Sequence, residues 1–125
     1  MFLKNRGLVI KIKANIIGLI KATGKVGEEA FSTVGALAGT IIKTTAGTGE
    51  DVVAATQGLL SGVIHSAKEM TVDVEKAVSA AATGAVKAAY EISAEVGDKV
   101  KNAATGTIDG IKVVVAEPFA QPKAA

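Results

Sequence analysis

Apolar residues recur with a period of eleven along most of the chain. When residues 8–117 are aligned in rows of eleven, ten rows fit without an insertion. Five columns hold 50 of the 110 positions but only one charge, Glu75, whereas the other six columns hold 22 charges. Eleven residues in three turns is about 3.67 residues per turn, close to the α-helical period. The pattern therefore predicts an amphipathic helix whose apolar columns fall in one arc of about 130°.

The unbroken frame predicts an all-α protein that is extended and not a compact globule. We expect a long amphipathic helix or a helical hairpin built from ten 11-residue repeats, with helices near 8–46 and 50–116. The Gly-rich segment 45–50 is the best candidate for a bend, because Thr48, with Asp51 three residues later, has the spacing of a helix N-cap. Both one bent rod and a hairpin are compatible with the pattern. The expected parts are a basic, apolar, helical leader at 1–25, the repeat helix at 26–117 and a tail at 118–125.

The apolar columns form a stripe that another surface must cover. Thirteen of the 14 Gly lie inside the repeats, and Gly, Thr, Val and Ile all weaken an isolated helix. The covering partner must therefore supply the folding energy. We expect this surface- or partner-binding stripe to comprise Leu8, Ile12, Leu19, Ile20, Phe31, Val34, Leu37, Ile41, Ile42, Val52, Val53, Leu59, Leu60, Val63, Ile64, Met70, Val74, Val78, Ile92, Val96, Val100, Ile108, Ile111 and Val114.

The charges are distributed unevenly along the chain. The net charge is +2, but residues 1–25 carry six cations and no acid, whereas residues 26–75 sum to −5. A basic, Ile-rich leader is typical of contact with an anionic surface. The alternative is that these cations only solvate an exposed face. The predicted contacts with an anionic surface are Lys4, Arg6, Lys11, Lys13, Lys21 and Lys25.

The composition leaves little chemistry for an active site. Only 3% of the residues are aromatic, although 49% are apolar, and the chain has one His and no Cys. Disulfides, thiolate metal sites and Cys nucleophiles are therefore excluded. His65 is interpreted as a solvated polar-face residue, and the Ser residues have no His–Asp partners at helical spacing. We expect no enzyme activity, no cofactor, no metal, no small-molecule substrate and no nucleic acid partner.

The leader lacks the sequence pattern of a cleavable signal peptide or a membrane-spanning segment. Lys11 and Lys13 interrupt the apolar run that a cleavable signal peptide needs. The uncharged runs elsewhere are shorter than the roughly 20 residues that span a bilayer as a helix. We therefore expect an intracellular protein on a membrane or granule surface, without a transmembrane helix.

The repeat resembles known lipid-binding families. Eleven-residue amphipathic repeats rich in Thr, Val, Gly, Ala, Lys and Glu are similar to those of synucleins and exchangeable apolipoproteins, and to phasin-like coat proteins of storage granules. The match covers residues 8–117 in period and composition, whereas fragments such as Thr23–Glu28 only echo the synuclein-type hexamer. The Pro that separates apolipoprotein repeats is absent before Pro118. The resemblance implies reversible coating of a surface.

Two functions follow from these observations. The first is a non-catalytic structural protein that coats a lipid membrane, lipid droplet or storage granule through its long amphipathic helix and polymerises there. The alternative is a self-assembling helical filament or a right-handed coiled-coil bundle without lipid, since the stripe also offers a 4-4-3 seam. Both make the protein a homo-oligomer or filament.

Overall fold

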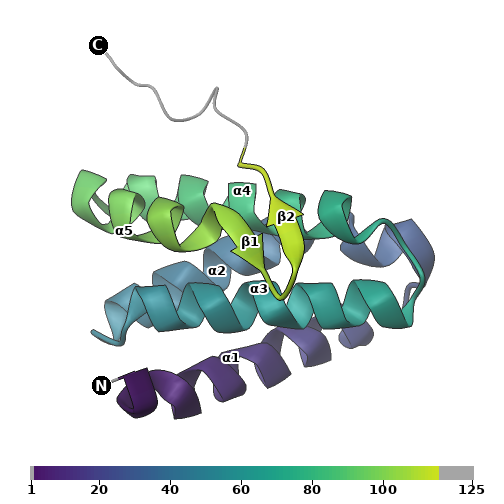
Figure 1. Cartoon of the computed structure of the whole chain (residues 1–125), viewed down its shortest axis with the longest axis horizontal. Coiled ribbons are helices and arrows are strands. Elements are labelled where there is room, and N and C mark those ends of the chain that lie inside the picture. The colour runs from purple at the N-terminus through teal and green to yellow at the C-terminus, as the bar shows by residue number, and fades with distance from the viewer. Residues whose placement is uncertain (1, 116–125) are drawn as a thin grey trace.

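The computed structural model describes residues 2–115, with only the backbone of residues 2–5, as helices and one short hairpin (Figure 1). The predicted tail at 118–125 lies outside the described residues. The elements are α1 (Phe2–Ala22), the 3₁₀ turn η1 (Gly27–Phe31), α2 (Val34–Gly47), α3 (Val52–Glu69), α4 (Val74–Ile92), α5 (Ala94–Ala104), β1 (Gly106–Ile108) and β2 (Ile111–Val113).

The helices pack in two close pairs. α1 lies along α3 and α2 lies along α4, while α3 and α4 contact each other and α5 packs on both. Figure 1 shows the helices stacked side by side, with α1 at the outer edge and the hairpin across α3 and α4. The all-α class is confirmed. The expectation of one long helix or an extended hairpin is wrong, because the chain folds into a compact multi-helix bundle.

The helix breaks recur every 22 residues. Gly27, Gly49 and Thr71 have φ angles of 66°, 77° and 54°, and Ser93, with extended backbone, separates α4 from α5. All four occupy one column of the eleven-residue frame, at every second row. The members of that column in the intervening rows are fully buried: Ile16, Ala38, Leu60, Ala82 and Ala104. The eleven-residue frame continues without an insertion because each turn falls at the same position of a 22-residue unit, which consists of one helical segment and one turn.

Backbone hydrogen bonds close the helices at these turns. After α3, the Thr71 amide donates to the carbonyl of Lys68 at 3.2 Å and the Val72 amide to that of Ala67 at 3.0 Å. The same pattern surrounds Gly49 after α2. Both turns are Schellman motifs, whose left-handed residue reverses the chain while satisfying the last helical carbonyls.

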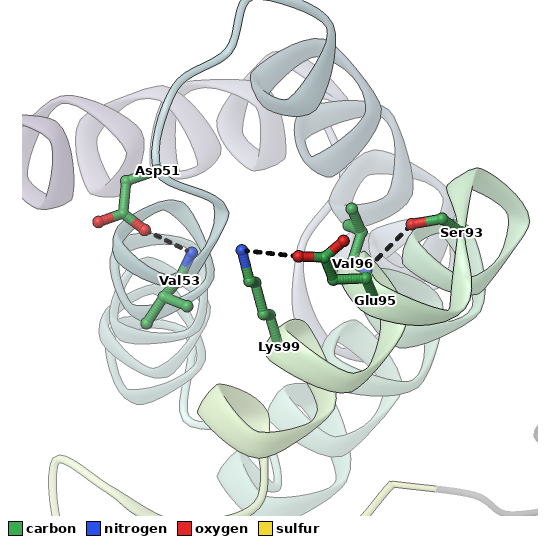
Figure 2. A network of polar contacts seen from close by, with 6 residues as sticks. All are labelled: Asp51, Val53, Ser93, Glu95, Val96 and Lys99. Atoms are coloured by element: carbon green, nitrogen blue, oxygen red, sulfur yellow. Dashed lines mark hydrogen bonds and ion pairs between the residues drawn. The ribbon is translucent and has the colours of Figure 1, made fainter.

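Side-chain caps begin the following helices. The Asp51 carboxylate accepts hydrogen bonds from the amides of Val53 and Ala54, at 2.9 and 3.2 Å. Ser93 accepts from the Val96 amide at 3.1 Å, and Figure 2 shows these two caps at one end of the bundle. Each cap pairs otherwise unpaired amides of a helix N-terminus, and such a cap typically stabilises the folded protein by about 1 kcal/mol.

Small residues let the helices of each pair approach closely. A Cβ atom on Gly84 of α4 would overlap the backbone of Gly35 in α2. On α3, a Cβ on Gly58 would overlap the Val9 carbonyl of α1, and one on Gly62 would overlap Ile16. The chain therefore builds a core with few aromatic residues, because closely packed backbones need only Ala, Val, Ile and Leu between them.

The C-terminal part of the repeat frame is not helical. The expected helix up to residue 116 ends at Ala104, and β1 and β2 pair antiparallel across Asp109 and Gly110. Both residues have positive φ, 49° and 81°, as a two-residue type I′ hairpin turn requires. The hairpin is tied to α3 because Ser61 Oγ donates to Asp109 Oδ2 at 2.6 Å.

Candidate anionic-surface interface

The predicted stripe lies mainly in the core of the bundle. Its side chains face neighbouring helices of the same chain, so the partner that covers the stripe is the chain itself. The buried members are Ile12, Ile20, Phe31, Val34, Ile41, Ile42, Val52, Leu59, Leu60, Val63, Ile64, Val78 and Val100. The members that are partly buried are Leu8, Leu37, Val53, Met70, Val74, Val96, Ile108 and Ile111.

The remaining members, Leu19, Ile92 and Val114, are exposed, by 36%, 42% and 58%. Ile92 shares its column with Val26, which is 78% exposed, and both residues directly precede a turn position of the 22-residue unit. They are exposed because the chain reverses there. Within the described residues, the folded stripe therefore offers no continuous apolar surface to a partner.

The cationic leader forms the outer helix of the bundle. α1 packs against α3 through Ile12, Ile16 and Ile20, which are almost completely buried. Its other side faces solvent along most of its length (Figure 1). Among the predicted contacts, Arg6, Lys11, Lys21 and Lys25 are exposed and Lys13 is half-buried, while the side chain of Lys4 lies outside the described part of the chain.

Five residues of α1 form one face that combines cationic and apolar side chains. At about 100° per residue, Arg6, Ile10, Lys13, Ile17 and Lys21 fall within an arc of about 80°. Ile10 is 60% exposed and Ile17 is half-buried. We call these five residues the α1 ridge. Ile10 and Ile17 were not predicted as contacts because they stand outside the apolar columns. They lie seven residues apart and alternate with cations, and this spacing indicates a second helical face.

The cations of the α1 ridge have no carboxylate partner among the described residues. Elsewhere in the described chain, ion pairs join Lys43 to Glu91 at 2.7 Å, Lys99 to Glu95 at 3.7 Å and His65 to Glu69 at 3.9 Å. Figure 2 shows the second of these beside the caps of α3 and α5. The ridge therefore carries positive charge that no described acidic side chain neutralises.

Some acidic side chains of the bundle make contacts between its helices. The hydrogen bond from Lys43 lowers the pKa of the Glu91 carboxyl, and the charge of Lys43 acts in the same direction. Tyr90 donates to Asp98 Oδ1 at 2.6 Å and links α4 to α5. The described residues contain no group of three or more His, Cys, Asp or Glu side chains that could hold a metal ion.

A cavity of about 220 Å³ opens at the end of the bundle where η1 meets the start of α4. Its walls are mainly apolar and include Phe31, Val72 and Ala77, and its rim carries the ionisable residues Glu28, Asp73 and Lys76. We call it the end cavity. Sequence reasoning could not place it, because its walls come from two turns that are far apart in the chain.

Comparison with protein-family models, with curated proteins and with solved structures finds no match for this chain. Among the described residues, none of the helices combines the length and the apolar character needed to cross a bilayer.

Proposed function

We propose that the protein is a non-catalytic structural module that binds an anionic intracellular surface through the α1 ridge while the bundle stays folded. The surface is a lipid membrane, lipid droplet or storage granule with exposed anionic groups. The observation that carries the proposal is that the exposed residues Arg6, Ile10 and Lys21 share one face of α1 with the half-buried Lys13. An interfacial helix binds through cations that contact the head groups and apolar side chains that enter the acyl boundary.

The strength of such binding follows from the ridge. Each cation contributes about 1 kcal/mol at an anionic surface. Burial of the exposed part of one Ile side chain adds about 1–2 kcal/mol. Binding of this strength is reversible and requires anionic lipid. It weakens with salt, because the Debye length falls to about 3 Å at 1 M ionic strength.

Coating through the apolar stripe would need a different state of the protein. The stripe side chains are core residues, so a surface or a filament partner could reach them only after the helix pairs separate. Separation would give up the close contacts of Gly84 with Gly35 and of Gly62 with Ile16. The folded bundle therefore favours binding through the ridge over coating through the stripe.

Vesicle flotation tests this proposal. Wild-type protein is expected to float with phosphatidylcholine vesicles that contain phosphatidylglycerol and to stay unbound with phosphatidylcholine alone. The variant Arg6→Glu/Lys21→Glu reverses two exposed ridge charges, and it is expected to bind about tenfold more weakly or worse. The control Lys87→Glu/Lys112→Glu makes the same change in net charge on α4 and β2, where both side chains are exposed.

The comparison of the two variants decides the matter. Equal loss of binding in both would mean that net charge, and not the ridge, drives association. Unchanged binding of the ridge variant would contradict the proposal.

A further inference from the structure

The turn between α1 and η1 holds an apolar side chain out in solvent. Val26 is 78% exposed, more than any other large apolar residue described. The turn is ordered, because Thr23 Oγ1 donates to the Ile20 carbonyl at 2.7 Å and accepts from the Lys25 amide at 3.2 Å. Gly27 supplies the positive φ, 66°, that directs the chain into η1. Val26 is therefore a fixed protrusion at this end of the bundle.

The end cavity lies next to this protrusion. Glu28 on its rim is two residues from Val26, so their Cα atoms are at most about 7 Å apart. An engineered apolar cavity of about 150 Å³ holds a benzene molecule. The end cavity, at about 220 Å³ and with Phe31 and Val72 in its walls, therefore has room for a valine side chain.

The charges around the two features are complementary. Lys25 flanks the protrusion and is exposed, while Glu28 and Asp73 stand on the rim of the cavity with one cation, Lys76. Glu29 is exposed on the same turn. An anionic membrane would repel Glu28 and Glu29, so this end of the bundle suits a protein partner with its own cation beside an apolar knob.

A second copy of the chain has that chemistry. A knob and a hole that lie side by side on one patch are self-complementary, and a two-fold axis then places each knob in the hole of the other copy. We propose that two copies associate end to end in this way, with Val26 of each copy in the end cavity of the other. In this contact Lys25 lies beside Glu28 and Asp73 of the other copy. The contact uses no residue of the α1 ridge and does not depend on the surface-binding proposal.

Sedimentation equilibrium without lipid tests the contact. Wild-type protein is expected to be in concentration-dependent equilibrium between monomer and dimer. Val26→Asp is expected to raise the dissociation constant tenfold or more, because it places a negative charge in an apolar cavity whose rim carries Glu28 and Asp73. The control Ile92→Asp changes an exposed apolar residue at the same position of the 22-residue unit, away from the cavity, and is expected to leave the dimer unchanged.

Cysteine cross-linking between two copies tests whether position 26 of one copy lies next to the end cavity of the other. The chain has no Cys, so a mixture of Val26→Cys protein with Ser32→Cys protein can form a disulfide between positions 26 and 32 only across copies. Ser32 lies on the wall of the end cavity and is exposed. The mixture is expected to give a cross-linked dimer, whereas a mixture of Ile92→Cys with Ser32→Cys is not.

Charge exchange gives a further test. Lys25→Glu and Glu28→Lys are each expected to weaken the dimer, and the double variant is expected to recover much of the affinity because the pair is restored in reverse. A wild-type protein that remains monomeric, a dimer that is indifferent to Val26→Asp, or absence of the 26–32 cross-link would each overturn the proposal. Loss of vesicle binding in Val26→Ser with an intact dimer would instead assign the turn to a membrane.

Discussion

Gly49 and Thr71 lie 22 residues apart and close successive helices with the same left-handed backbone, at φ angles of 77° and 54°. Glycine adopts this conformation without steric cost, but a β-branched residue does so only under strain. The turn after α3 is therefore a strained version of the turn after α2. The strain is retained because the Schellman hydrogen bonds and the cap at Asp73 surround it.

Replacing Thr71 by Gly should therefore stabilise the bundle. We expect the free energy of unfolding to rise by about 1 kcal/mol, because the new residue relieves the strain at positive φ. Urea denaturation followed by circular dichroism measures this change. Thr40→Gly is the opposite control, since Thr40 is an exposed residue inside α2 and glycine weakens a helix interior. A loss of stability in both variants would show that Thr71 is not strained.

The close crossing of α2 and α4 makes a second prediction. Gly84→Ala would drive a methyl group into the backbone of Gly35, so the helices must separate. We expect a loss of about 1–3 kcal/mol or more in the free energy of unfolding. Gly18→Ala is the matched control, because nothing lies within 4 Å of its Cβ position in α1. The same substitution there should stabilise the protein by up to about 1 kcal/mol.

The ion pair between Lys43 and Glu91 makes stability depend on pH. The pKa of Glu91 is lowered from its ordinary value of 4.5, so the pair stabilises the folded state above that value. This contribution is lost as the pH falls below 4.5 through the pKa of the folded state. It is small, because both side chains are about half exposed.

Glu91→Gln tests this dependence. The variant should be slightly less stable than wild type at neutral pH, and the difference should shrink as the pH falls and Glu91 becomes protonated. Urea midpoints across the acid range measure it. In a Lys43→Gln background the effect of Glu91→Gln should shrink, since the hydrogen bond and charge of Lys43 are gone and only the weaker influence of Lys87 remains. A constant difference at every pH would rule out the ion pair as its source.

The helical class and the membership of the core could be read from the sequence, because apolar side chains such as Leu59, Val63 and Val78 recur at helical spacing. The turns could not be found by looking for a slip in the frame. Their signal was present in one column, where Asp51, Asp73 and Glu95 alternate with glycines such as Gly62 and Gly84. Acidic residues begin helices and glycines allow close crossings, so that alternation indicates helix and turn units of 22 residues.

The partner of the stripe could not be predicted from its pattern. A periodic apolar face indicates that it is covered, but a lipid surface, another chain or another part of the same chain could each cover it. The α1 ridge depends on which face of α1 the bundle leaves free, and the end cavity depends on two turns meeting in space. Both are products of the tertiary arrangement.

A staple across α2 and α4 can hold this helix pair closed during binding. The Cβ position of Gly39 lies 3.2 Å from the Cβ atom of Ala88, a few tenths of an ångström below the usual disulfide range of about 3.5–4.5 Å. Gly39→Cys/Ala88→Cys should therefore form a disulfide after a small shift of the helices. It would be the only disulfide, because the chain has no native Cys.

The most direct test of the surface-binding account is flotation of this stapled protein, oxidised and reduced, with vesicles of phosphatidylcholine and phosphatidylglycerol. We expect equal binding in both states, and loss of binding when Arg6→Glu/Lys21→Glu is added to the oxidised protein. Binding that requires reduction of the staple would mean that the bundle opens to expose its apolar stripe, and it would contradict attachment through the α1 ridge of a folded protein.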